Sequence, residues 1–464
     1  MNKDYKQSLI DLVAEYEAMT ERQTVTFLDV KAYERLIDFY EEEEQLDRAL
    51  EVTDFAISHH PFSVDFHIKK AELLLADERA EKALVVLDRA AAFAPLEPEI
   101  ALLRAEAFIN LDQLDTAGDI LDDLKSGAEG ELLSDILFVE SMIYQHQELY
   151  EMTYFSLRES LRVFPTNRDA IERIWNSIDM CKRYEEAIDL FEMVLEADAY
   201  STLAWYYLGH AHSYKGNYAQ AIECYEYAYL TDETFEAGCR ECAELCLQLK
   251  LYRKALRFYE ELMENFEPDS EVLQQIGLCH QYLEQYKIAR TFYTQALNYD
   301  PLDDEVLFHI GECFAKEENW KRAIRYFQKA IDIEDSREEY YGSLAAAYGQ
   351  LKDLENASDN FEKAIEVAPE ESRYWIEYTC FLLFMQEGEE ALALIDEAEE
   401  NAGGMELLYC RVACLFFTGR RQEGIYRLSE ALEEDFETHR LLFNYLPSLE
   451  TDPDIISVIS AYMM

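Results

Sequence analysis

Turn-forming residues are scarce in this chain of 464 residues, which holds only 15 glycines and 9 prolines. β-Sandwiches and β-barrels need more turn residues than that, because every short strand ends in one. The abundant alanine, leucine and glutamate favour helix instead. An apolar fraction of 49% is sufficient for a packed core and excludes a disordered chain. We therefore expect an all-α fold.

Positive charge is also scarce. The chain has 41 Lys and Arg against 96 Asp and Glu, which gives a net charge of −55. Such a field repels the phosphates of nucleic acids and of anionic bilayers. We therefore expect no nucleic-acid partner and no membrane partner, and we expect a charged partner to be rich in Lys and Arg. The alternative is that the charge only keeps a long surface soluble.

Long apolar runs are missing as well. No stretch approaches the roughly 18 apolar residues of a membrane-spanning helix. The first twenty residues contain no apolar run followed by a small-residue cleavage site, so we expect no signal peptide. The ten cysteines are spread through predicted helices rather than framing loops. These features together predict a reducing, cytoplasmic location.

One pattern recurs at a spacing of 34 residues. Ala221 has counterparts, each 34 residues after the last, at Ala255, Ala289, Ala323, Ala357 and Ala391. Towards the N-terminus, and beyond two inserted residues near 126–130, the register continues through Ala117, Ala83 and Ala49. After Ala391 one residue is missing, and Gly424 takes the position. Two antiparallel helices of about 13 residues with short turns occupy such a period.

Further positions repeat with the same spacing. Twelve residues before the alanine stands a small residue, as at Gly209, Gly277 and Gly311, and four residues after it stands a large one, as at Tyr225. Small residues let two helices cross closely, and large residues fill the gaps between hairpins. The sequence therefore predicts about 12 tandem antiparallel helical hairpins.

The residues at these repeated positions resemble the sequence motif of the tetratricopeptide repeat family. Trp205, Leu208 and Gly209 keep its W-x-x-L-G spacing, and the later positions are matched by Tyr218, Ala221, Tyr225 and Ala228. The resemblance covers roughly residues 30–440. It implies a right-handed superhelical solenoid whose first helices line a concave groove that binds a peptide or a partner's helix.

The ends of the array need caps, because a hairpin cannot bury its apolar face alone. We expect an N-terminal capping helix at 1–25, the repeat array at 26–440 with slight irregularity near 124–135 and 400–430, and a C-terminal capping segment at 441–464. Within that segment, Asp452 and Pro453 can open a last helix. Its apolar residues either dock on the last repeat or make an end that dimerises.

Three pairs of residues have the spacing of a capping box at the start of a helix, and they are Thr26 with Asp29, Thr166 with Asp169, and Ser336 with Glu339. We therefore expect Thr26, Thr166 and Ser336 to be N-caps.

Cys239, Cys242 and Cys246 are spaced to lie on one helix face. A thiolate site is one interpretation of this spacing. However, these positions of the repeat are the ones where first helices pack into the core, and a tetrahedral metal site needs a fourth ligand. We favour core packing and expect no metal and no cofactor. No glycine-rich phosphate loop and no His-Glu-x-x-His motif is present, so we expect no enzyme.

The family resemblance also indicates which first-helix residues face the groove. In the middle of the chain we expect these to contact the partner: Phe138, His146, Tyr206, Tyr207, His210, Tyr214, Gln274, Gln275, Tyr282, Phe308 and His309. Near the N-terminus the same positions are expected to form an acidic rim of Glu34, Asp38, Glu41 and Glu42. Towards the C-terminus they hold residues that include Ser343, Ala346, Gly349, Cys380 and Phe384. Tyrosines offer large contact area at low entropy cost, and glutamines can bond a peptide backbone.

The predicted function is that of a protein-interaction scaffold or adaptor, which binds a protein segment or peptide in the groove, and we expect that segment to be basic. The alternative is a structural subunit of a larger assembly that uses the convex faces and the termini, with the groove incidental. Self-association through the C-terminal segment belongs to this alternative.

Overall fold

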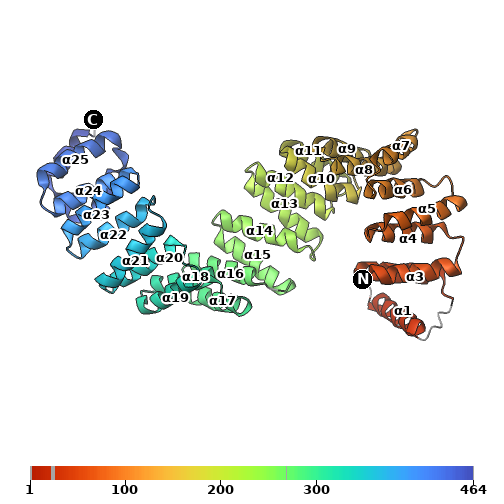
Figure 1. The fold of residues 1–464 in the computed structure, drawn as a ribbon, viewed down its shortest axis with the longest axis horizontal. Coiled ribbons are helices and arrows are strands. Elements are labelled where there is room, and N and C mark those ends of the chain that lie inside the picture. Colours follow the sequence, from red (N-terminus) through yellow and green to blue (C-terminus); the bar gives the residue numbers. More distant parts are fainter. Residues whose placement is uncertain (1–2, 22–26, 268, 463–464) are drawn as a thin grey trace. The chain divides into compact units, whose positions relative to one another are not determined.

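The computed structural model describes residues 3–21, 27–267 and 269–462, which form helices joined by short turns, with no strand among them. The chain divides into two units, Met1–Gly238 and Cys239–Met464. Within each unit, helical hairpins follow one another side by side in sequence order (Figure 1). The predicted all-α class and the repeated hairpin are confirmed.

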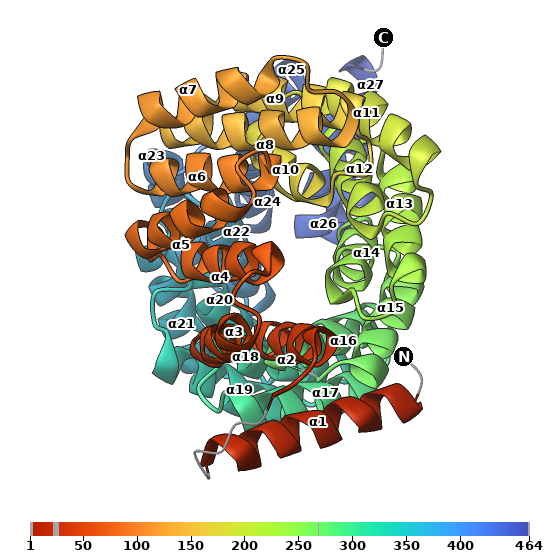
Figure 2. The same cartoon turned by 90° about the vertical axis from the view of Figure 1, so that its right-hand side faces the viewer.

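The first unit holds a leading helix, α1 (Lys3–Glu21), and six hairpins, each made of a first helix with an even number and a second helix with an odd number. These are α2 (Val30–Glu42) with α3 (Leu46–His59), α4 (Val64–Ala76) with α5 (Ala80–Phe93), α6 (Pro98–Asn110) with α7 (Leu114–Lys125), α8 (Gly130–His146) with α9 (Tyr150–Val163), α10 (Arg168–Cys181) with α11 (Tyr184–Ala197), and α12 (Thr202–Tyr214) with α13 (Tyr218–Thr231). Figure 2 shows that in this unit the first helices lie on the inner side of the curve and the second helices on the outer side.

Helix α14 (Glu236–Gln248) crosses the boundary between the units and opens the seventh hairpin. The remaining hairpins complete the second unit: α14 with α15 (Tyr252–Asn265), α16 (Ser270–Tyr282) with α17 (Tyr286–Tyr299), α18 (Asp304–Lys316) with α19 (Trp320–Ile333), α20 (Glu338–Gln350) with α21 (Leu354–Val367), α22 (Ser372–Phe384) with α23 (Gly388–Asn401), and α24 (Met405–Phe417) with α25 (Arg421–Glu434). Two 3₁₀ turns, Glu437–Arg440 and Pro447–Thr451, and the helices α26 (Leu441–Tyr445) and α27 (Pro453–Tyr462) follow. The described residues thus contain twelve hairpins, as predicted.

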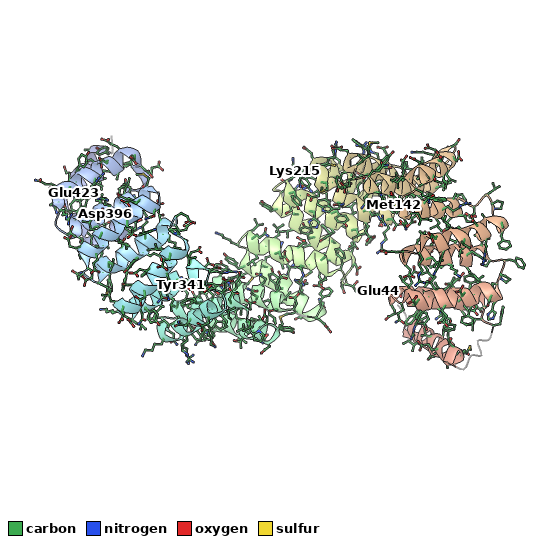
Figure 3. The ribbon with its side chains drawn as sticks, in the orientation of Figure 1. Glu44, Met142, Lys215, Tyr341, Asp396 and Glu423 are labelled. Atoms are coloured by element: carbon green, nitrogen blue, oxygen red, sulfur yellow. The ribbon has the colours of Figure 1, made fainter. Side chains whose placement is uncertain are left out.

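A residue with left-handed backbone ends the first helix of every hairpin, with φ between 55° and 78°. The twelve positions are Glu44, which is labelled in Figure 3, then Glu78, Asp112, Glu148, Lys182, Gly216, Lys250, Glu284, Glu318, Lys352, Gln386 and Gly419. Only two of them are glycine, although a side chain in this region costs energy. The recurring turn therefore belongs to the hairpin geometry and is imposed by the packing of the two helices.

The same turns show how the chain absorbs its two irregularities. The step between turns is 34 residues except before Glu148, where it is 36, and before Gly419, where it is 33. Helix α8 has 17 residues where other first helices have 13 or 14, while α7 is short at 12, so the insertion lengthens α8. The deletion shortens the connection between α23 and α24 to residues 402–404.

Close crossing of the two helices depends on the small-residue column. A β-carbon added at Gly209 would lie 2.5 Å from a ring carbon of Tyr225, and at Gly311 it would lie 2.6 Å from a ring carbon of Phe327. Both rings are at most 1% exposed. The large residue of one helix therefore fills the space left open by the glycine of the other.

Two predicted N-caps are wrong by one residue. Helix α10 is capped by Asn167, whose Oδ1 accepts from the Ala170 amide at 3.1 Å, and not by Thr166. Asn167 is favoured as the N-cap because its side-chain amide also donates to Ser134 Oγ at 2.9 Å inside the core. Helix α20 begins after Arg337, since Ser336 Oγ instead donates to Glu334 in the preceding turn. Thr26 lies outside the described residues, and Asp29 caps α2.

Both ends of the described chain pack on the neighbouring hairpin. In α1, Val13 and Tyr16 are buried, and Glu17 accepts from Arg48 at 2.5 Å. In α27, Ile455 and Ile459 are buried, while Ile456 is 48% exposed. These contacts agree with the interpretation in which the last helix docks on the last repeat. The segment boundaries at residues 25 and 440 stay predictions.

The cysteine cluster is part of the core. Cys239, Cys242 and Cys246 are each fully buried, as the packing interpretation predicted. All ten cysteines of the chain are free thiols. Across the described residues, no group of three or more His, Cys, Asp or Glu side chains is arranged to hold a metal ion. Within the same residues, no helix combines the length and apolarity needed to cross a bilayer.

Candidate functional site

A cavity of about 340 Å³ opens on the first helices of the first three hairpins. Its apolar floor is Ile37 from α2 with Phe66 and Ile68 from α4, all buried. The charged residues around this floor are Glu34, Asp38, Asp65, Glu72, Glu99 and Lys69. We call this site the acidic cavity, because five carboxylates surround a single ammonium group.

Most carboxylates of the acidic cavity have no cationic partner. Lys69 Nζ lies 2.8 Å from Glu41 and 3.3 Å from Glu72, so its charge is already shared. Four carboxylates form no ion pair within the described residues, those of Glu34, Asp38, Asp65 and Glu99. The site therefore keeps a negative charge that its own chain does not neutralise.

Neighbouring carboxylates on the same face resist ionisation. Burial, and then repulsion from Glu72, raises the pKa of Glu99. Burial also raises the pKa of Glu106 on α6, although Arg173 opposes the shift. On α8 burial, followed by repulsion from Glu131, raises the pKa of Asp135. A cation brought to this face would relieve the repulsion.

Only part of the predicted acidic rim lines the cavity. Glu34 and Asp38 do, Glu41 is paired with Lys69, and Glu42 is exposed at the end of α2. Sequence reasoning missed Asp65 and Glu99. A signal for them existed, because acidic residues recur in one column at Asp65, Glu99, Asp135 and Asp169.

An aromatic cluster occupies the first-helix face of α10 and α12. Trp175 stacks on Tyr207 with ring centroids 5.5 Å apart and planes 2° from parallel. Tyr184 from α11 stacks on Tyr214 at 4.6 Å and 4°. The predicted residues of α12 therefore lie together, and Trp175 covers one face of Tyr207 while Tyr184 covers one face of Tyr214. Tyr214 remains 58% exposed.

His210 is held neutral inside this cluster. Burial lowers its pKa to about 4, with an opposing influence from Asp179. Its Nδ1 lies 3.0 Å from Tyr225 Oη, and the ring of Tyr206 meets it edge-on at 4.4 Å. His210 therefore acts as a packing residue of the hairpin, and Tyr214 is the part of α12 most open to a partner.

The two predicted residues of α8 lie apart from each other. Phe138 lies beneath the Arg173 guanidinium, 5.2 Å from ring centroid to Cζ. His146 is exposed at the end of α8, with Nδ1 3.8 Å from Asp112.

In the second unit, polar groups of α16, α17 and α18 bond one another. Tyr293 Oη donates to Gln281 Oε1 at 2.8 Å, and Gln281 Nε2 donates to Glu312 at 3.0 Å. His309 Nδ1 lies 2.9 Å from the same carboxylate. Burial would raise the pKa of Glu312, but the hydrogen bonds from His309 and Gln281 outweigh burial and lower it. His309 is thus engaged within the unit.

The other predicted residues of this unit differ in what they offer. Phe308 stacks on Tyr340 at 4.6 Å, and Tyr282 stacks on Tyr252 at 4.6 Å while staying 54% exposed. Gln274 is partly exposed on α16. Gln275 Oε1 is buried without a hydrogen-bond donor within the described residues.

A cavity of about 550 Å³ lies between the first helices α20 and α22 of the second unit. Its floor is formed by the small residues of α20, which are Gly342, Ser343, Ala346 and Gly349. Cys380, Phe381 and Phe384 of α22 form its wall. We call this site the small-residue cavity. It exists because α20 has small residues at these positions, whereas the equivalent positions of α18 hold large side chains, such as Phe308, His309 and Glu312. The sequence showed this run of small residues, but our predicted contact set left it out.

The family of the chain follows from direct comparison. The sequence model of the tetratricopeptide repeat matches residues 202–235, 338–371, 33–98 and 276–338. The chain is a tetratricopeptide repeat protein. Tetratricopeptide repeat protein 37 of Xenopus laevis is 27% identical over 179 residues, which cover 36% of this chain. The match spans only 11% of that relative's length.

Solved structures with tandem helical hairpins are similar to this tetratricopeptide repeat chain. The crystal structure of YrrB, a TPR protein with an unusual peptide-binding site, is 18% identical, covers 40% of this chain and 95% of its own, and has a TM-score of 0.35. The APC/C hetero-tetramer Cut9-Hcn1 is 12% identical, covers 94% and 97%, and has a TM-score of 0.36. The crystal structure of MamA is 17% identical, covers 36% and 98%, and has a TM-score of 0.34.

Membership in the tetratricopeptide repeat family supports protein binding in general, and such arrays are typically not enzymes. The identity of the bound protein has to come from the chemistry of the surfaces.

Proposed function

We propose that this protein is an interaction scaffold that binds a Lys- or Arg-rich segment of a partner protein along the first helices of its first unit. The acidic cavity carries the proposal, since five carboxylates and one ammonium surround an apolar floor. We also propose that the protein acts in the cytoplasm, because its ten cysteines are free thiols and the cytoplasm keeps thiols reduced.

The acidic cavity has the chemistry to receive one long basic side chain. The methylene stem of a lysine or arginine would lie against Phe66 and Ile37, and its charged head would reach the surrounding carboxylates. Four of those carboxylates have no ion pair of their own to break. Binding would therefore replace repulsion between carboxylates with attraction, and salt would weaken it.

The exposed tyrosines extend the same surface. Tyr214 offers an accessible ring at the end of α12, and a basic segment can stack a guanidinium on such a ring. Tyr184 and Trp175 contact this ring, and Tyr207 and His210 pack on Trp175 in turn. We therefore assign Tyr207 and His210 a positioning role. The predicted residues of the second unit, including Gln274 and Tyr282, stay predicted partner contacts on the first helices of that unit alone.

The test is fluorescence anisotropy of the full chain with a labelled peptide rich in Lys and Arg, at low and at high salt. Exchanging Glu34, Asp38, Asp65 and Glu99 for their amides is expected to weaken binding roughly tenfold or more, because several charge-assisted contacts disappear.

The matched control removes four carboxylates elsewhere. Glu366, Glu390, Glu397 and Glu400 are exposed on the second helices α21 and α23, and their exchange for Gln changes the net charge equally. Equal loss of binding in both variants would mean that only total charge matters, and the proposal would fail.

The second candidate function is assembly of a larger complex through the termini. The exposed Ile456 of α27 favours it, because this apolar side chain lies beside two buried ones on a terminal helix. Light scattering of the wild type and of Ile456→Asp tests it. An oligomer that the substitution dissociates would support assembly, whereas a monomer in both cases would exclude this route.

A further inference from the structure

Two second helices carry charge opposite to that of the chain. Helix α17 has Lys287 and Arg290 and no carboxylate. Helix α19 has four cations, Lys321, Arg322, Arg325 and Lys329, against the single carboxylate of Asp332. Every other second helix in the described chain is neutral or negative. We call the six cations of α17 and α19 the basic face.

The cations of the basic face are available at the surface. Lys287, Lys321, Arg322, Arg325 and Lys329 are exposed. Within the described residues none of these five forms an ion pair, although carboxylates outnumber cations by more than two to one in this chain. Arg290 is the exception, with Nη1 2.8 Å from Glu317. The basic face therefore keeps most of its charge for a partner outside the chain.

The position of these cations does not serve the stability of the helices. Lys287 and Lys321 are the second residues of α17 and α19, where the positive end of the helix dipole repels a cation. At the same position most other second helices carry an acid, as at Asp47, Glu185 and Glu355. Because the acid is the stabilising choice there, the lysines point to a role in binding.

Aromatic rings hold part of the basic face in place. The Arg290 and Arg322 guanidinium carbons lie 4.2 Å and 5.4 Å from the centroid of the Phe314 ring, which lies between α17 and α19. Tyr326 stacks on Phe314 at 5.6 Å, and Lys329 Nζ lies 5.1 Å from the Tyr326 ring. Cations held over rings lose less rotational freedom on binding, and arginine offers a planar fork that matches a carboxylate.

The surface between the cations suits a protein segment. Ile288 is 45% exposed on α17, beside exposed Thr291 and Thr294. The two threonine hydroxyls donate to the backbone carbonyls of Lys287 and Arg290, so their methyl groups remain for contact. Apolar contact beside fixed cations fits a segment that alternates acidic and aliphatic residues.

We propose that the basic face of α17 and α19 binds an acidic segment of a partner protein, separately from the acidic cavity. A long polyanion such as nucleic acid fits less well, because the next second helix, α21, has four carboxylates against one lysine. A duplex carries charge at every step along its axis and would have to pass this repulsive helix. A short acidic segment ends before it.

The experiment uses the full chain and a labelled peptide rich in Glu and Leu, with fluorescence anisotropy as the readout. The double reversal Lys287→Glu and Arg325→Glu is expected to weaken binding roughly tenfold or more, since it turns two attractions into repulsions. The melting temperature of the variant should not fall, because Glu is the better residue in the first turn of α17.

The matched control reverses Lys82 and Arg89, which are exposed on the second helix α5 and form no ion pair within the described residues. This control should bind the acidic peptide like the wild type, and both variants should bind the basic peptide unchanged, which keeps the test separate from the acidic cavity.

Three results would overturn the proposal. One is equal affinity of the wild type and the basic-face variant for the acidic peptide. Another is tighter binding of a labelled DNA strand than of the peptide. The third is an oligomer of the full chain that the basic-face variant dissociates, since the acidic partner would then be a second copy of this chain.

Discussion

The two units treat polar residues on their first helices in opposite ways. In the described part of the first unit, four carboxylates of the acidic cavity lack ion-pair partners, and the partly buried His210 bonds Tyr225 rather than a carboxylate. In the second unit, His309 and Gln281 bond Glu312, and small side chains leave an open cavity between α20 and α22. The same hairpin therefore supports one surface with repulsion between carboxylates and another with an unfilled cavity. This is possible because the two helices of a hairpin pack through other positions, such as Gly209 against Tyr225.

The largest expected effect is acid sensitivity that His210 brings to the first unit. As the pH falls below about 6.5, the unfolded chain binds a proton at this position, while the folded chain resists it until about pH 4. The folded state thus loses stability across this window as pH falls, on the order of 3 kcal/mol. His210→Gln should remove most of this difference between pH 7 and pH 4.5, measured by urea unfolding of the first unit's signal.

His146 provides the control for His210, because it is exposed at the end of α8. His146→Gln should leave the pH dependence of unfolding as in the wild type. If His210→Gln unfolds with the wild-type pH dependence, His210 is not the buried neutral group described above.

A smaller effect separates a packed position from an open position on the floor of the small-residue cavity. A β-carbon added at Gly342 would lie 2.5 Å from a ring carbon of Tyr374, so Gly342→Ala should lower the free energy of unfolding by about 1–3 kcal/mol. Ala346 is exposed on the cavity floor. Ala346→Leu should change stability by less than about 0.5 kcal/mol. Equal costs in urea unfolding would show that both positions are packed and that the void does not persist in solution.

The smallest effect compares one carboxylate of each unit. Burial raises the pKa of Glu106, so the folded state favours its protonated form and loses stability as pH rises through that pKa. Glu106→Gln should therefore raise the free energy of unfolding at pH 7 by about 0.5 kcal/mol, and the gain should vanish at low pH.

Glu312 should respond with the opposite sign. Its hydrogen bonds lower its pKa, so its stabilisation is present at neutral pH and is lost as the pH falls through that pKa. Glu312→Gln should lower the free energy of unfolding at pH 7 by about 1 kcal/mol. Thermal unfolding at pH 7 checks both variants. If Glu106→Gln and Glu312→Gln change the free energy of unfolding in the same direction, the contrast between the units is wrong.

Most of the fold could be predicted from the sequence, because the hairpin is a local structure with a repeated signal. The 34-residue columns of alanine, glycine and large residues predicted twelve hairpins and both irregularities. The caps at Thr166 and Ser336 were wrong, since Asn167 is selected by its bond to Ser134 in a neighbouring hairpin. Nothing within the helix itself distinguishes the two candidate caps.

The candidate site was predicted less completely than the fold. Columns identified Glu34, Asp38 and the tyrosines of α12 as facing one surface, but they did not show that Tyr207 is covered by Trp175. Two cavities and the pairing of cations depend on side chains from several helices at once.

The sequence alone thus determined the hairpin, its register and the excess of negative charge, because each follows from residue type and spacing. The tertiary structure decided which carboxylates lack partners, where small residues leave a void and which cations stay unpaired. These properties arise only when neighbouring helices of the array pack against one another, because distance and burial then set the strength of every charge.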